Sequence, residues 1–243
     1  MKGIILAAGR GSRMGRLTDA KPKGFLEVQG RSLINRQIEA FNLAGINEVA
    51  VVTGYKGSMF RDLPVQIFHN HEWATSNMFH SLSMAKTWLG MYECIISYSD
   101  IFYKSSAIDA LAQCGDDIAL TYDTNWHALW SQRFENPLDD AETFKIDTES
   151  YLTEIGAQPE NILEICGQYM GLFKMSPAGW KVVEQYNSKL EHSVVLNSHM
   201  TDVFRYIIQN DLIKIKGIPY SEKWGEVDSE QDLKLYNAWH NLD

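Results

Sequence analysis

The stretch "ILAAGRGSRM" at residues 5–14 ends an aliphatic run in a turn built of alanine, glycine and serine that carries two arginines. Glycines let the backbone approach a ligand closely and leave its N–H groups unobstructed. Successive exposed N–H groups form a concavity for anions, and Arg10 and Arg13 add positive charge to it. We therefore expect a buried strand over 3–8 that leads into an anion-binding turn.

A second basic segment follows closely. In "DAKPKGF" (19–25), Lys21 and Lys23 flank Pro22, whose ring stiffens the loop. A rigid loop with two positive charges beside a glycine turn is suited to a polyphosphate. The glycines of "GRGSRMG" (9–15) are spaced as GxGxxxG, unlike a dinucleotide fingerprint, and the Gly-Lys-Ser/Thr ending of a Walker A loop is absent from the sequence. The alternative to a polyphosphate-binding site is a tight structural turn whose arginines are solvated.

The composition limits the classes of partner. The chain has 243 residues, 45% of them hydrophobic, which fits one α/β domain. A formal net charge of −9 argues against nucleic-acid and membrane surfaces, although local cations can still hold a small anion. No apolar run approaches the roughly 20 residues of a membrane span. The first apolar run is too short for a signal peptide, so we expect a cytoplasmic protein.

Three cysteines, Cys94, Cys114 and Cys166, lie far apart in the sequence. This spacing favours small buried side chains over a zinc site or a disulfide framework.

Apolar runs alternate with helix-like stretches in the first half of the chain. This order predicts a Rossmann-like α/β fold, with a mostly parallel, mixed sheet and helices on both faces. Ligands of such sheets bind beyond the carboxyl ends of the strands, where Gly9, Gly54 and Asp100 are expected to meet. The expected strands are 3–8, 47–55, 65–70, 93–100 and 117–123, and the expected helices are 32–45, 77–90 and 108–115.

The pattern changes after residue 124, where we expect the chain to extend the sheet and cover the crevice. The expected elements are a hairpin of 142–147 and 151–156, strands at 167–175 and 213–218, and helices at 177–187, 200–210 and 229–241.

The glycine turn and "KPKGFLEVQGRSLI" (21–34) together resemble bacterial nucleotidyltransferases, which join a nucleoside monophosphate to a phosphorylated acceptor. Segments 126–147, 167–180 and 224–236 are most similar to the choline-phosphate cytidylyltransferase-like branch. The resemblance implies the nucleotidyltransferase (GT-A-like) fold and a single domain over 1–243. Residues 1–123 would bind the nucleotide, and residues 124–243 would bind the acceptor.

The resemblance also implies roles for individual residues. Arg13 and Lys23 would neutralise the triphosphate and the acceptor phosphate. Asp100 and Asp228, from "SD" and "EVD", would hold Mg²⁺, and these four are the expected catalytic residues. The expected nucleotide contacts are Leu6, Ala7, Ala8, Gly9, Gly11, Ser12, Arg13, Gly54, Ser76, Asn77 and Ser99.

The chemistry supports these roles independently. An acceptor phosphate oxygen attacks the α-phosphorus and pyrophosphate leaves. The attacking oxygen is already anionic, so the reaction needs relief from negative charge more than it needs a general base.

Three weaker patterns leave alternatives open. Ser76 or Asn77 could instead cap a helix, and His69 and His71 lack further metal ligands. The aromatic residues after position 125 could be core, or could form with Glu142 a pocket for a cationic group; Glu142 could also pair with Arg133. The expected acceptor contacts are Lys23, Trp126, Trp130, Glu142 and Tyr169.

The favoured hypothesis is Mg²⁺-dependent transfer of CMP from CTP to a small phosphorylated, amine-bearing acceptor. Phosphocholine is placed before phosphorylated glutamine or an aminoalkyl phosphonate, and the product would serve cell-surface glycan biosynthesis. The alternatives are a sugar-1-phosphate nucleotidyltransferase using UTP or dTTP, and a catalytically silent nucleotide-binding module. The sequence leaves open whether the protein is a monomer or a homo-oligomer.

Overall fold

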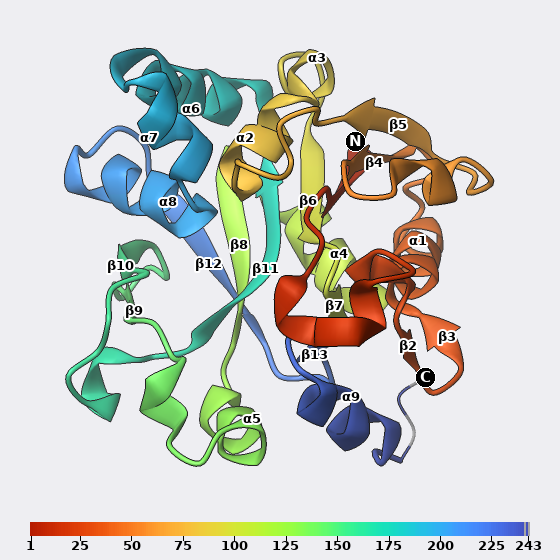
Figure 1. The fold of residues 1–243 in the computed structure, drawn as a ribbon. Helices are drawn as coiled ribbons and strands as arrows, with labels where there is room; N and C mark the ends of the chain where they lie inside the picture. Colours follow the sequence, from red (N-terminus) through yellow and green to blue (C-terminus); the bar gives the residue numbers. More distant parts are fainter. Residues whose placement is uncertain (241, 243) are drawn as a thin grey trace.

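A seven-stranded mixed sheet forms the centre of the molecule (Figure 1). The computed structural model describes residues 1–240 and 242, apart from the side chain of residue 192. Six strands run parallel, and only β11 runs antiparallel to its neighbours, which confirms the predicted fold class. The strand order is β12 (Ile215–Tyr220), β8 (Ile118–Asp123), β11 (Gln168–Met175), β6 (Cys94–Tyr98), β1 (Lys2–Ala7), β4 (Val49–Thr53) and β5 (Gln66–His69).

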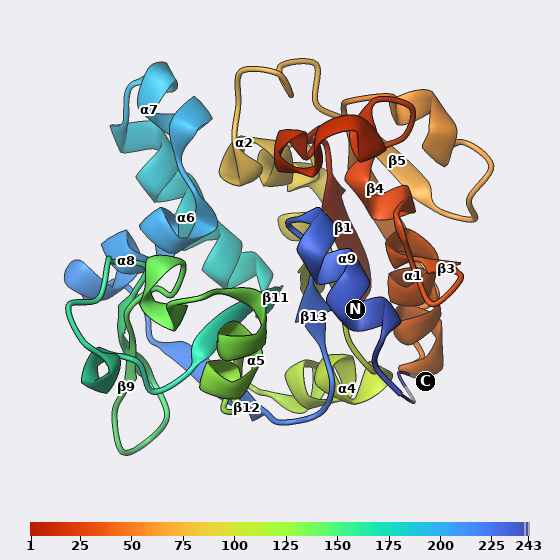
Figure 2. The same ribbon diagram turned by 60° about the horizontal axis from the view of Figure 1, so that its bottom comes forward.

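The hydrophobic core lies in two layers, one on each face of this sheet. Alternation along β1 sends Ile5 into one layer, and Ile4 and Leu6 into the other. One layer is covered by α1 (Leu33–Leu43), α4 (Ser105–Gln113), α5 (Trp126–Arg133) and α9 (Glu230–Asn237). The other is covered by α2 (Met78–Ser83), α3 (Lys86–Leu89), α6 (Pro177–Lys189), α7 (His192–Asn197) and α8 (Met200–Gln209) (Figure 2).

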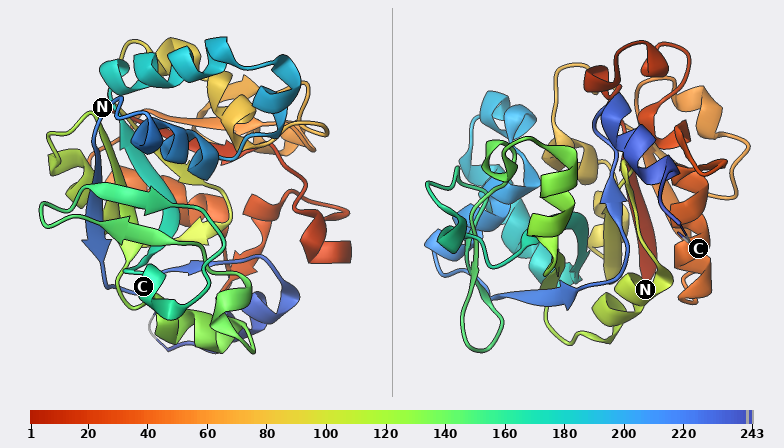
Figure 3. Two further views of the ribbon diagram at one scale, coloured as in Figure 1. Left: turned by 90° about the vertical axis from the view of Figure 1, so that its left-hand side faces the viewer. Right: turned by 90° about the horizontal axis from the view of Figure 1, so that it is seen from below.

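Capping residues set both boundaries of α1 as the sequence predicts. The Ser32 hydroxyl accepts the N–H of Asn35 at the start of α1, and Gly45, at φ 77°, follows its end. The second half contributes β11 and β12 to the sheet, together with the hairpin β9 (Phe144–Ile146) and β10 (Leu152–Ile155). The hairpin faces the viewer in the left panel of Figure 3.

Some boundaries differ from the expectation. The single helix expected over 77–90 is two short helices, α2 and α3. The hydroxyls of Ser81 and Ser83 donate to the carbonyls of Asn77 and His80, and such back-bonding competes with the helical ladder. The helix α5 was not predicted, because its apolar residues do not gather on one face. The helix α7 and the 3₁₀ turn Ser12–Thr18 were not predicted either, because 6 and 7 residues are too few for a periodic pattern.

The cysteines follow the prediction only in part. All three are free, as expected, but only Cys94 is buried, whereas Cys166 is exposed. The exposure of Cys166 corrects the expectation of three buried thiols. Across the described part of the chain, no helix has both the length and the apolarity that a membrane crossing requires.

Candidate active site

The two basic segments of the sequence meet in the structure. Gly11 has a φ of 71°, a conformation that favours glycine. A Cβ atom on Gly11 would lie 2.9 to 3.1 Å from the side-chain carbons of Lys23. The glycine therefore lets the stem of Lys23 pass beside the turn, which explains why the two motifs occur together.

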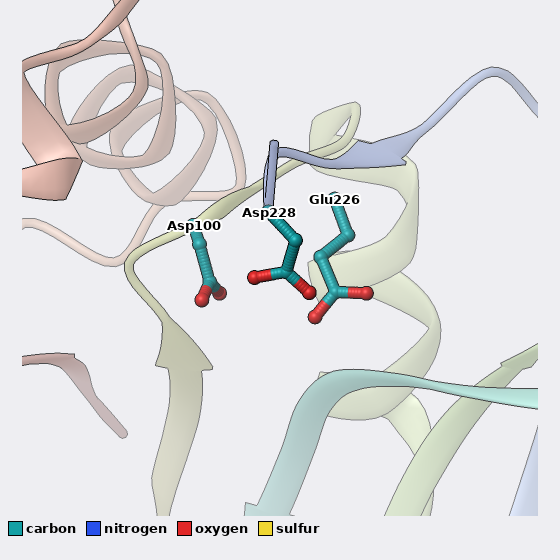
Figure 4. Close-up of side chains that lie close together, drawn as sticks. All are labelled: Asp100, Glu226 and Asp228. Atoms are coloured by element: carbon teal, nitrogen blue, oxygen red, sulfur yellow. The ribbon is translucent and has the colours of Figure 1, made fainter. Parts of the chain in front are cut away.

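Three carboxylates converge beyond the end of β6. Asp100 follows β6, while Glu226 and Asp228 come from the segment around β13 (Gly225–Glu226). Pairing of β13 with β7 (Ile101–Phe102), and a 2.9 Å hydrogen bond from Val227 N–H to the Asp100 carbonyl, join these distant segments. One oxygen from each carboxylate lies within 4.8 Å of the others (Figure 4). The structure thus brings Asp100 and Asp228 together, as expected from the sequence.

Two cations meet this cluster from the N-terminal half. The buried Lys23 ammonium donates to Asp100 Oδ2 at 2.9 Å and also to Asp228, and an Arg13 Nη lies 3.1 Å from Asp228 Oδ1. Burial alone would lower the pKa of Lys23, but Asp100 and Asp228 raise it above its usual value. Burial would raise the pKa of Asp228, but Lys23 and Arg13 lower it. Both groups are therefore charged at neutral pH.

Arg133 contacts this cluster and the loop that carries part of it. The sequence did not indicate this role. The fully buried side chain of Arg133, from α5, donates to Asp232 at 3.0 Å and to Glu226 at 3.3 Å. Asp232 Oδ2 accepts the backbone N–H groups of Asp228 and Ser229 at 2.9 and 2.8 Å. Arg133 and Asp232 thus fix the loop that presents Glu226 and Asp228. The suggested pairing of Arg133 with Glu142 is not found.

The "EVD" motif also contains Glu226, which the sequence did not indicate as a metal ligand. Residues two apart in an extended segment share a face, so this spacing could have placed Glu226 beside Asp228. Burial, and then the charge of Asp228, raise the pKa of Glu226 to about 8.

Two cavities meet at these side chains, and Arg13, Met78 and His199 line both. We name the first the nucleotide-side cavity because most of the expected nucleotide contacts line it. Its lining is Leu6, Ala8, Gly9, Gly11, Ser12, Arg13, Lys23, Ser76, Asn77, Met78, Ser81, Ser99, Asp100 and His199. We name the second the acceptor-side cavity because it holds most of the expected acceptor contacts. Its lining includes Tyr98, Trp130, Asp140, Glu142, Gln168, Tyr169, Glu226 and Asp228.

Three of the expected contact residues, Ala7, Gly54 and Trp126, line neither cavity. Gly54 packs closely against Trp73 and Ala8, since a Cβ atom on it would be 2.4 Å from Trp73 Cβ and 2.6 Å from the Ala8 carbonyl oxygen. Trp126 is buried in the core beside Trp130. Alternation turns the side chain of Ala7 into the core layer under α1. These positions give the three residues packing roles.

Asn77 occupies the N-cap position of α2, but its side chain makes no capping bond. Its backbone N–H instead donates to the Leu196 carbonyl, and its amide donates to the Asn197 carbonyl, each at 2.6 Å. Asn77 therefore joins the nucleotide-side cavity to the second half of the chain. His69 donates to or accepts from Thr53 at 3.1 Å, and neither His69 nor His71 belongs to a metal-type cluster within residues 1–240.

Comparison with known proteins assigns the family. Residues 3–159 match the model of the MobA-like NTP transferase domain. The chain belongs to this family. This nucleotidyltransferase is 34% identical to CTP:phosphoglutamine cytidylyltransferase of Campylobacter jejuni over 97% of its own length and 98% of the relative's. It is 38% identical to choline-phosphate cytidylyltransferase of Streptococcus pneumoniae over 35% of its length and 39% of that relative's, which places it with the choline-phosphate cytidylyltransferase-like branch.

Solved structures show the same fold. The nucleotidyltransferase superposes on CTP:phosphocholine cytidylyltransferase of S. pneumoniae with a TM-score of 0.74 at 20% identity, covering 97% of each chain. It superposes on the inositol-1-phosphate CTP transferase of T. maritima with a TM-score of 0.76 at 19% identity, covering 97% of this chain and 93% of the other. Identities this low support the fold alone.

Proposed function

We propose that this nucleotidyltransferase transfers CMP from CTP to a small phosphorylated acceptor that bears an amine, and releases pyrophosphate. The observation that carries the proposal is the meeting of two cavities at one cluster of carboxylates and cations. Residues 1–123 would supply most of the nucleotide contacts and residues 124–243 most of the acceptor contacts. The cytidine assignment is supported by the relative in C. jejuni, which aligns with nearly the whole chain.

The residues fit a divalent cation of the magnesium type. Carboxylate oxygens are the ligands that Mg²⁺ prefers, and buried Asp100 Oδ1 has no hydrogen-bond partner among the described residues. Asp100 and Asp228 would hold the ion, with Glu226 beside them. When bound, Mg²⁺ would screen the negative charge of the triphosphate.

Arg13 and Lys23 would also screen the negative charge of the triphosphate. Arg13 and Lys23 lie where the two cavities meet, so they can contact both the triphosphate and the incoming phosphate. One acceptor phosphate oxygen forms a bond to the α-phosphorus, and the bond from that phosphorus to the bridging oxygen breaks. Positive charge placed at this point lowers the repulsion between the two anions.

The acceptor-side cavity favours a positively charged group. Burial raises the pKa of both Glu142 and Asp140, so each carboxylate would be stabilised by a bound ammonium. Trp130 and Tyr169 add aromatic surface, which attracts cations. The sequence alone favoured phosphocholine. We now propose phosphorylated glutamine first, since its ammonium suits the same carboxylates, and the whole-length similarity to the phosphoglutamine enzyme supports this order.

The activity test combines each of the four nucleoside triphosphates with Mg²⁺ and an acceptor panel, and follows pyrophosphate release. The panel contains phosphorylated glutamine, phosphocholine, an aminoalkyl phosphonate and sugar 1-phosphates. We expect release with CTP and an amine-bearing acceptor. Release only with UTP or dTTP and a sugar 1-phosphate would establish the sugar alternative. Tight CTP binding without release would indicate a silent module.

The product would be a CDP-activated compound. A relative at 24% identity over 86% of this chain is a low-salt glycan biosynthesis nucleotidyltransferase of Haloferax volcanii, which supports a role in glycan biosynthesis. CTP is a cytoplasmic metabolite, so we place the reaction in the cytoplasm.

Two tryptophans test the acceptor assignment. Trp130→Leu should raise the acceptor KM by about three- to thirtyfold, the range of one cation–π contact, and leave the KM for CTP unchanged. Trp126→Leu is the matched control, because Trp126 lies on the same helix but lines neither cavity. It should lower the free energy of unfolding by about 1–3 kcal/mol without changing the acceptor KM. Equal acceptor KM values for the two variants would remove Trp130 from the acceptor site.

A further inference from the structure

The lining of the nucleotide-side cavity contains both charged and uncharged residues. Arg13, Lys23 and Asp100 carry charge, and the two cations suit a triphosphate. The uncharged lining residues include Leu6, Ala8, Ser76 and Ser81. If the proposed function holds, the base of the nucleotide lies among these uncharged residues. Their polar atoms can then form hydrogen bonds that distinguish one base from another.

A buried asparagine fixes the orientation of the two serines. Asn70 follows β5 and is fully buried. Its Oδ1 accepts the backbone N–H of Glu72 at 2.9 Å, and because that N–H can only donate, the amide orientation is determined. The Asn70 Nδ2 therefore donates to Ser76 Oγ at 2.9 Å and to Ser81 Oγ at 3.0 Å. Both amide protons of Asn70 are therefore engaged in hydrogen bonds.

The hydroxyl protons of the two serines are also engaged in hydrogen bonds. Ser76 Oγ donates to the Glu72 carbonyl at 2.8 Å, and Ser81 Oγ donates to the Asn77 carbonyl at 3.3 Å. Carbonyl oxygens can only accept, so these directions are fixed as well. Each hydroxyl has used its proton and one lone pair, and retains one lone pair. Both serines line the cavity, and they can therefore accept a further hydrogen bond there but cannot donate one.

We infer that Ser76 and Ser81, oriented by Asn70, select the pyrimidine by its exocyclic group. A hydroxyl that can only accept binds the 4-amino group of cytosine. The same lone pair opposes the 4-carbonyl oxygen of uracil or thymine. Polar groups arranged in this way discriminate strongly, because the wrong base leaves an unpaired acceptor against another acceptor.

The test compares CTP, UTP and the triphosphate of a pyrimidin-2-one nucleoside, which lacks the 4-amino group. Equilibrium binding and kcat/KM are measured for the wild type and for Ser76→Ala, Ser81→Ala and the double variant. We expect the wild type to favour CTP over both analogues by about tenfold or more. The double variant should lose most of this preference, because binding of CTP weakens while binding of the amino-free analogue stays unchanged.

Ser83→Ala is the matched control. Ser83 ends the same helix and donates to a backbone carbonyl, but it does not line the cavity, so this variant should keep the wild-type preference. Asn70→Ala frees a second lone pair on each serine but leaves both serine protons on the Glu72 and Asn77 carbonyls, so this variant should still favour CTP over UTP; circular dichroism reports whether its fold is intact. A wild type that favours CTP with an unchanged preference in the double variant would overturn this inference alone. A wild type that favours UTP would overturn both the inference and the cytidine assignment.

Discussion

Asp100→Ala should lower kcat by about a hundredfold or more, the usual effect of removing one electrostatic contact to a developing charge. Asp100 is one of three carboxylates within 4.8 Å of one another, and it also holds Lys23. Its loss removes a proposed metal ligand and leaves Lys23 bound to Asp228 alone. The fold should persist, because the Asp100 backbone carbonyl still accepts from Val227. Steady-state pyrophosphate release and thermal unfolding provide the measurements.

Asp123→Asn is the control for a buried aspartate at the same edge of the sheet. Asp123 ends β8, and its Oδ1 accepts the Asn125 N–H at 2.7 Å, a bond that asparagine retains. It lines neither cavity, so turnover should stay within about twofold of the wild type, as for substitutions remote from the reacting charges. Turnover of Asp100→Ala equal to that of Asp123→Asn would refute the metal assignment.

The fold was largely predictable because its signals are local. Continuous aliphatic runs mark β1, β4, β6 and β8, and a serine cap marks the start of α1. The direction of β11 was not predictable in this way, because strand direction depends on which neighbours pair with it. Its antiparallel course between β6 and β8 is a tertiary property.

The site was predictable where topology or the family pattern constrains it. The carboxyl ends of parallel strands meet, which brings Asp100 to the glycine turn. How deeply a side chain is buried could not be predicted in this way. Trp126 and Trp130 are four residues apart and share a helix face, yet only Trp130 reaches the acceptor-side cavity. Arg133 acts through partners that are far away in the sequence, and Asn70 acts through the directions of its hydrogen bonds. The periodicity of a sequence contains neither kind of information.

Lys23→Met should change metal affinity and turnover in opposite directions. The Lys23 ammonium contacts Asp100 and Asp228, the carboxylates that we propose as metal ligands, so the ammonium and the metal compete for the same oxygens. Removing the ammonium should raise the affinity of the nucleotide-free protein for Mn²⁺, used as a stand-in for Mg²⁺, by about tenfold or more. Turnover should fall by about a hundredfold or more, because one cation facing the phosphates is lost.

The stability of this variant should show the same competition. Without metal, buried Asp100 loses its paired cation and Asp228 is left with Arg13 and Arg133, which should lower the free energy of unfolding by about 3–5 kcal/mol. Mn²⁺ should then raise the melting temperature more in Lys23→Met than in the wild type, since the ion binds the folded state. Lys21→Met is the control, because Lys21 lies across Pro22 and pairs with neither carboxylate. Unchanged or weaker Mn²⁺ binding by Lys23→Met in calorimetry would mean that lysine and metal do not share these oxygens, and Lys23 would then act on the phosphates alone.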